Sequence, residues 1–231
     1  MSTSAPRREP LVVDSECVSL WDKLSERQRA HLEKLHAAAQ AKNPALTETA
    51  ADRCALEPAT GKAIVIGILN PVVKRGAVLY EGSGPTRRED GIDWIQCSEA
   101  EMLSYLWRTI QGRQIVTFNG FSFDGPFLTG RSYIHGIKPL HRCASRWYDR
   151  DVHMDLREEL SIWGKAKAYN LDFTCELLGI PSPKGELDGS KVGEWYRAGR
   201  IAEIAAYCLR DLWATTALWQ HLAPCLPSWT K

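Results

Sequence analysis

The sequence predicts an α/β fold in which one sheet carries helices on both of its sides. Short runs of apolar and β-branched residues at 10–18 and 63–69 have the length and composition of buried strands. Apolar residues recur at helical spacing over 99–110 and 200–222. Strands come first and helices alternate with short strands afterwards, which is the order of elements found in sheets covered by helices.

The composition is that of a globular protein, with 44% hydrophobic and 25% charged residues. We expect one domain at 10–222 between tails at 1–9 and 223–231. The net charge of +1 means that any affinity for nucleic acid must come from local basic clusters. Seven cysteines without a C-x-x-C pair indicate free thiols and a cytoplasmic location. No apolar run has the length of a membrane span.

The first predicted strand, at 10–18, carries two acids within an apolar run. Side chains on a strand alternate, so Asp14 and Glu16 share one face about 7 Å apart. Like charges side by side destabilise a strand unless a cation lies between them. A D-x-E triplet is expected about once by chance in such a chain, but one embedded in an apolar strand is rarer.

A helical insertion is expected after this strand. Ser25 can cap a helix at 25–41, and the prolines of the following loop end the inserted segment, which spans about 20–58. A strand at 63–69 and an antiparallel partner at 77–80 should follow, and the charged stretch 87–91 is expected to be an exposed loop.

The stretch 115–128 predicts a strand, a break and a new helix. The apolar run ends at Asn119, and Asp124 follows just past the carboxyl end of the strand, where open α/β sheets build their sites. A carboxylate in such apolar surroundings requires a cation or a metal. The alternative is that Asp124 only caps the following helix.

A basic and aromatic patch follows at 142–150. Its arginines alternate with Trp147 and Tyr148, which suits phosphates and stacked bases, although a solvated loop is the alternative. The arginines are Arg142, Arg146 and Arg150.

Two acids mark the last predicted elements. Asp155 lies between a short strand and a helix and is expected to cap that helix, with a role as a further acid at the site as the alternative. On the helix at 200–222, Tyr207 and Asp211 are four residues apart and share a face. Asp211 could instead pair with Arg210 or Arg200.

Four acids therefore stand at three places in the chain. Carboxylates without cysteine or histidine companions are hard oxygen ligands, which suit Mg²⁺ or Mn²⁺ rather than zinc. Two such ions about 4 Å apart can activate a water and stabilise the leaving oxygen in a phosphoryl displacement. Tyr207 is placed to orient that water. The acids are Asp14, Glu16, Asp124 and Asp211.

These residues resemble the three motifs of the DnaQ-like DEDD 3′–5′ exonucleases, which read D-x-E, N-x-x-x-F-D and Y-x-x-x-D. The tyrosine is typical of the DEDDy branch, and the flanking sequences are similar to the proofreading exonuclease domain of family-B DNA polymerases. The resemblance covers most of 11–222. The matching segments are Val13-Asp14-Ser15-Glu16, Asn119-Gly120-Phe121-Ser122-Phe123-Asp124 and Tyr207-Cys208-Leu209-Arg210-Asp211.

The resemblance implies an RNase H-like fold with a mixed five-stranded sheet flanked by helices. It also implies hydrolysis of single-stranded nucleic acid, DNA favoured, from the 3′ end. Asp14 would bridge two Mg²⁺ or Mn²⁺ ions, Glu16 and Asp211 would bind the ion that activates water, and Asp124 would support the other. Tyr207 would orient the nucleophile.

Contacts to the substrate are expected from Asn119, Cys17, Phe123, Arg146 and Lys184. Ser15 and Cys17 depart from the family, which usually has an apolar residue and a threonine at these positions. A polymerase or another replication or repair protein is a possible partner. The alternatives are an exoribonuclease of the same branch, a nuclease that a partner activates, and a non-catalytic nucleic-acid-binding or scaffold module.

Overall fold

The computed structural model describes residues 8–143, 149–182 and 189–226. Its centre is one mixed sheet with the strand order β4-β5-β3-β2-β1-β6-β7. β1 pairs antiparallel with β2 and parallel with β6, so it lies in the middle of the sheet. The strands are β1 (Pro10–Ser19), β2 (Gly61–Asn70), β3 (Arg75–Glu81), β4 (Arg87–Glu89), β5 (Ile92–Cys97), β6 (Gln114–Thr117) and β7 (His153–Asp155).

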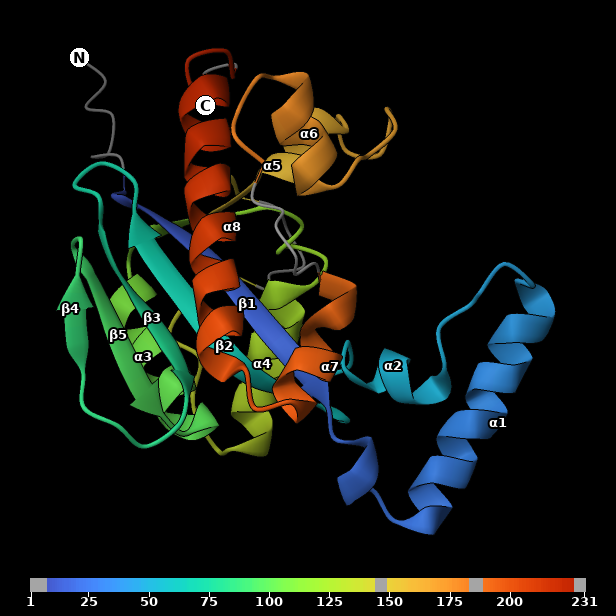
Figure 1. The fold of residues 1–231 in the computed structure, drawn as a ribbon. Coiled ribbons are helices and arrows are strands. Elements are labelled where there is room, and N and C mark those ends of the chain that lie inside the picture. The colour runs from blue at the N-terminus through green and yellow to red at the C-terminus, as the bar shows by residue number, and fades with distance from the viewer. Residues whose placement is uncertain (1–7, 144–148, 183–188, 227–231) are drawn as a thin grey trace.

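Helices cover both faces of the sheet, as the sequence predicts (Figure 1). α8 packs on one face over a first cluster of buried apolar side chains. α3 and α4 pack on the other face and share a second cluster. The helices are α1 (Glu26–Lys42), α2 (Ala50–Cys54), α3 (Glu99–Ile110), α4 (Asp124–Ile134), α5 (Leu156–Leu160), α6 (Leu171–Leu177), α7 (Val192–Arg197) and α8 (Ile201–Leu222), with 3-10 turns η1 (Trp21–Lys23) and η2 (Gly189–Lys191). In the described part of the chain, no helix is long and apolar enough to cross a membrane.

The expectation of five strands is wrong, because β4 and β5 form a hairpin that extends the sheet to seven strands. Asp90 and Gly91 make its turn with φ values of 51° and 82°, a left-handed pair that favours two-residue hairpins. The three residues of β4 are charged and exposed, as is common at a sheet edge. Their polarity is the reason that the sequence suggested a loop.

The predicted insertion is present between β1 and β2. Ser25 forms a capping box with Gln28 at the start of α1, yet α1 has no buried residue and projects from the body of the protein (Figure 1). The two ends of the insertion meet, since the backbone N–H of Leu20 donates to the carbonyl of Thr60 at 2.8 Å.

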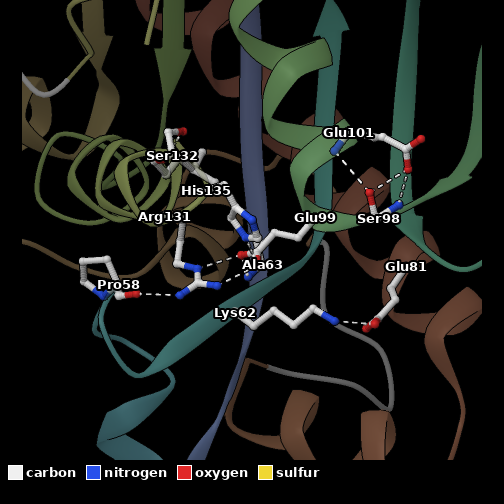
Figure 2. Close-up of polar contacts among 11 residues, drawn as sticks. Pro58, Lys62, Ala63, Glu81, Ser98, Glu99, Glu101, Arg131, Ser132 and His135 are labelled. Carbon is white, nitrogen blue, oxygen red and sulfur yellow. Dashed lines mark hydrogen bonds and ion pairs between the residues drawn. The ribbon is translucent and has the colours of Figure 1, made fainter. Parts of the chain in front are cut away.

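A buried ion pair fixes α4 against the sheet (Figure 2). The guanidinium of Arg131 donates to both oxygens of Glu99 at 2.8 and 2.7 Å and to the carbonyl of Pro58 at 2.9 Å. Glu99 also accepts from the backbone N–H of Ala63 and contacts the ring of His135. These bonds hold the pKa of Glu99 below its usual value although burial acts in the opposite direction. One carboxylate thus links α3, α4 and β2.

Candidate metal and nucleic-acid site

β1 presents its two acids to α8. Asp14 lies opposite Gly67 of β2 in the antiparallel pairing. A Cβ atom at Gly67 would lie 2.6 Å from Leu212 Cδ1 and 2.8 Å from Cys208 Sγ. The missing side chain therefore lets α8 approach the sheet closely. The Cys208 thiol also lies 3.9 Å from the carbonyl oxygen of Asp14, so α8 meets β1 at the first acid.

Three of the four predicted acids meet at this contact. Asp14, Glu16 and Asp211 each offer one carboxylate oxygen, and these oxygens all lie within 4.8 Å of one another. Tyr207, one turn earlier on α8, lies close enough to Asp211 for its hydroxyl to lower the pKa of this carboxyl, against the larger effect of burial. The shared helix face of Tyr207 and Asp211 is thus directed to the acids of β1.

Among the described residues, no ion pair joins Asp211 to Arg200. Arg200 pairs with Glu203 at 2.6 Å. Arg210 lies over the ring of Tyr207, 5.6 Å from its centroid, and its charge only partly offsets the burial that raises the pKa of Asp211.

Asp124 lies beside this cluster and is held by Ser15. The Ser15 hydroxyl donates to Asp124 Oδ1 at 2.5 Å, and both residues are buried. Asp124 is the first residue of α4, and Phe123 is the N-cap, so the alternative that Asp124 caps this helix is not what the structure shows. Ser15, which lies between Asp14 and Glu16 in the sequence, therefore orients Asp124.

Burial disfavours the charged forms of all four acids, and repulsion from the other acids of the site adds to this effect at Asp14 and Glu16. Burial, followed by the charge of Asp211, raises the pKa values of Asp14 and Glu16 well above those of exposed carboxyls. Burial likewise raises the pKa of Asp124 to about 6 and that of Asp211 to about 6. A bound cation would relieve this repulsion.

The donor set fits hard divalent cations. Within the described residues, Asp14 Oδ2 and Asp211 Oδ1 are buried and accept no hydrogen bond. Buried polar atoms normally have partners. Oxygen ligands alone suit Mg²⁺ or Mn²⁺, so these residues are able to hold such an ion.

The raised pKa values predict that the cluster costs stability at neutral pH without metal. In EDTA, an Asp124→Asn/Asp211→Asn variant should be more stable than the wild type at pH 7. Folded pKa values of about 6 exceed the unfolded value of about 4, so the folded wild type takes up protons as the pH falls to 5. The advantage of the variant should shrink over this range.

Urea unfolding at both pH values measures this difference. The histidines also titrate between pH 7 and 5, but they are present in both proteins, so their effect on the free energy of unfolding cancels in the difference. Asp22→Asn, at an exposed position, serves as the control. A constant difference between pH 7 and 5 would contradict the prediction.

Asp155 organises the loop before Asp124 and is confirmed as a helix cap. Its fully buried carboxylate accepts from the backbone N–H groups of Arg157 and Glu158 in α5. It also accepts from Asn119 and Phe121, at 2.9 and 2.8 Å. The alternative of Asp155 as a member of the acidic cluster is not supported, because its oxygens are occupied by these bonds.

The predicted substrate contacts are only partly accessible. Asn119 Oδ1 accepts from Arg157 at 2.9 Å, and the ring of Phe123 stacks on Phe127 with centroids 5.5 Å apart. Cys17 is partly buried, and burial raises the pKa of its thiol. Arg146 and Lys184 lie outside the described residues.

The basic patch is divided in the structure. Arg150 forms an ion pair with Glu159 at 2.5 Å, whereas Arg142 is exposed and lines a cavity. Trp147 and Tyr148, like Arg146, fall outside the residues that the structure describes.

Comparison with known proteins agrees with the predicted fold and with the resemblance to family-B polymerases. A DNA polymerase of Pyrococcus glycovorans is 27% identical over 147 residues, which are 56% of this chain and 19% of the polymerase. The chain thus spans about a fifth of that relative. The structure of a family B DNA polymerase from the hyperthermophilic archaeon Pyrobaculum calidifontis matches with a TM-score of 0.61 and 17% identity, over 97% of this chain and 26% of the polymerase. At that identity the likeness concerns the fold.

A family model described as a predicted 3′–5′ exonuclease related to the exonuclease domain of PolB matches residues 71–225. The matched span contains Asp124, Tyr207 and Asp211, while Asp14 and Glu16 precede it. The similarity to the exonuclease domain of family-B polymerases is thereby confirmed. Because the match covers more than half of the chain, the protein belongs to this family of predicted exonucleases related to PolB.

Proposed function

We propose that the protein is a 3′–5′ exonuclease that hydrolyses single-stranded nucleic acid, preferably DNA, with the help of two divalent cations. The observation that carries this proposal is the meeting of Asp14, Glu16 and Asp211 within 4.8 Å, with buried oxygens left unpaired within the described residues. A module that only bound nucleic acid would gain nothing from carboxylates, which repel phosphates.

The four acids would divide two cations between them. Asp14 would contact both, Glu16 and Asp211 would complete the site of one, and Asp124 would support the other. Such a pair of bound ions supplies an activated water and stabilises the leaving oxygen. The hydrogen bond from the Ser15 hydroxyl fixes the orientation of the Asp124 carboxylate for this role.

Tyr207 would orient the attacking water. Burial and the neighbouring Asp211 raise the pKa of its phenol, so the hydroxyl keeps its proton at neutral pH. The protonated hydroxyl can position the water by hydrogen bonding and is not a phenolate base at neutral pH.

Replacement of Tyr207 by Phe removes only this hydroxyl. We expect turnover to fall about 10- to 100-fold, the effect of one lost hydrogen bond in the transition state, with unchanged Mn²⁺ binding and thermal stability. Tyr133→Phe, at a 69% exposed position, is the matched control. Full activity of Tyr207→Phe would remove this residue from the mechanism.

A 5′-labelled single-stranded oligonucleotide tests the proposed reaction directly. The protein is incubated with the DNA and the RNA form in Mg²⁺, Mn²⁺ or EDTA. A metal-dependent ladder that shortens from the 3′ end supports the proposal, and the more rapidly shortened substrate identifies the sugar, because discrimination depends on the 2′-hydroxyl. Intact substrate in every lane would favour a scaffold or a nuclease that requires a partner.

We also propose a cytoplasmic location and a partner in replication or repair. All seven cysteines are free thiols, as expected in a reducing cytoplasm. The relationship to a polymerase domain suggests a polymerase or another replication or repair protein as partner, which co-purification from the native organism would test.

A further inference from the structure

A basic cavity lies apart from the four acids, on the side of the sheet where β7 forms the edge. Its volume is about 620 Å³, within the range of pockets that hold small ligands. Arg8, Gly112 and Val152 border it, and these residues precede β1, β6 and β7. The cavity thus opens near the amino ends of three parallel strands, whereas the acids lie toward their carboxyl ends.

The charge of this cavity is unbalanced. Arg8, Lys138 and Arg142 line it and are exposed, and Asp149 is the one acid on its wall among the residues that the structure describes. None of the three cations forms an ion pair within the described residues.

Neighbouring arginines are neutralised, in contrast. Arg113 pairs with Glu9, and Arg150 pairs with Glu159. In a chain of net charge +1, three unpaired cations around one hollow form a local attraction for phosphate. The apolar side chains of Pro139 and Leu140 on the same wall offer a surface for a sugar or base.

The cavity is connected to the acids by the loop that carries the second motif. Phe121 lines the cavity, and Asp124 follows three residues later beside the acidic cluster. Arg8, which precedes β1, and Asp14 on this strand are six residues apart, which corresponds to about 20 Å of extended chain. A nucleic-acid strand with about 3.4 Å per nucleotide would need about six nucleotides to cover this distance, and fewer if extended.

We infer that this cavity binds the phosphate backbone of the single-stranded substrate several nucleotides 5′ of the cleaved bond, through Lys138, Arg142 and Arg8. The inference rests on the proposed function in so far as the strand also reaches the acids. A dinucleotide is too short to occupy both places. The cavity should therefore affect long substrates and leave the shortest ones unchanged.

Binding in EDTA tests the inference without catalysis. A fluorescent 12-nucleotide strand is titrated into the wild type, a Lys138→Gln/Arg142→Gln variant and an Arg27→Gln/Lys34→Gln control, which removes the same charge from exposed positions of α1. We expect the first variant to bind about 10-fold more weakly at low salt. The slope of log affinity against log salt should fall by about 1.4, since each lost contact to a single strand contributes about 0.7.

Cleavage in Mn²⁺ supplies a second readout. The Lys138→Gln/Arg142→Gln variant should raise KM for the 12-nucleotide substrate and leave kcat/KM for a dinucleotide unchanged. Wild-type affinity and salt slope in this variant, or an equal loss in the α1 control, would overturn the inference. Competition by a nucleoside monophosphate as effective as that by the strand would also overturn it, in favour of a site for a free nucleotide.

The failure of this inference can be told from the failure of the proposed function. If the wild type cleaves no substrate but the Lys138→Gln/Arg142→Gln variant loses affinity for the strand, the proposed nuclease activity is refuted and the proposed binding site is supported. If the wild type shows metal-dependent cleavage but the variant has an unchanged salt slope, the nuclease activity is supported and the binding site is refuted.

Discussion

Asp14→Asn is expected to abolish metal-dependent cleavage, with a loss of at least about 1,000-fold, or about 4 kcal/mol of transition-state stabilisation. Asp14 lies within 4.8 Å of both Glu16 and Asp211, and its Oδ2 is one of the buried oxygens without a partner in the described residues. The amide that replaces it has nearly the same shape but no charge, so the change removes cation affinity rather than packing. Initial rates on a labelled strand and calorimetric titration with Mn²⁺ measure the two effects.

The same substitution should make the metal-free protein more stable. Burial and the charge of Asp211 raise the pKa of Asp14 well above its usual value, which means that the ionised form destabilises the fold. A higher melting temperature of Asp14→Asn in EDTA, together with lost activity, would separate a metal ligand from a structural residue. Activity within tenfold of the wild type would contradict the assignment, and a lower melting temperature would attribute the lost rate to misfolding.

Arg131→Met is expected to cause the largest loss of stability, about 3–5 kcal/mol, because it leaves a buried carboxylate without its cation. The side chains of Arg131 and Glu99 are only 6% and 4% exposed. Urea unfolding measures the loss, and the melting temperature should fall by on the order of 10 °C.

Two further variants separate the causes of this loss. Arg88→Met breaks an ion pair with Asp93 in which Arg88 is 73% exposed, and it should lower the free energy of unfolding far less than Arg131→Met, because exposed ion pairs contribute little to stability. Glu99→Gln/Arg131→Met leaves no charge buried alone and should recover part of the stability. A double variant as unstable as Arg131→Met would show that packing, and not the isolated charge, causes the loss.

The sequence predicts the parts of the site that depend on local geometry. Alternation along a strand places Asp14 and Glu16 on one face, and the spacing of four on a helix places Tyr207 beside Asp211. The structure confirms both relations. The strand-to-helix junction at Asp155 likewise predicts its role as a cap.

Contacts between distant segments were not predictable in this way. Ser15 and Asp124 are 109 residues apart, and Glu99 and Arg131 are 32 apart. No periodicity relates such pairs, because their meeting depends on how α3 and α4 pack on the sheet. The hairpin of β4 and β5 was missed for another reason: its edge strand is charged, although the Asp90-Gly91 turn was a usable signal.

The backbone hydrogen bond between Leu20 and Thr60 makes the segment inserted after β1 structurally separable from the sheet. Ser19 and Gly61 are the last paired residues of β1 and β2. The inserted segment between Leu20 and Thr60 therefore begins and ends at neighbouring positions, which the hydrogen bond joins. Closing a longer flexible loop costs only about 0.6 kcal/mol for each doubling of its length. Evolution or an engineer can therefore lengthen, shorten or exchange the excursion that contains α1 while the spacing of Asp14 and Glu16 stays as it is.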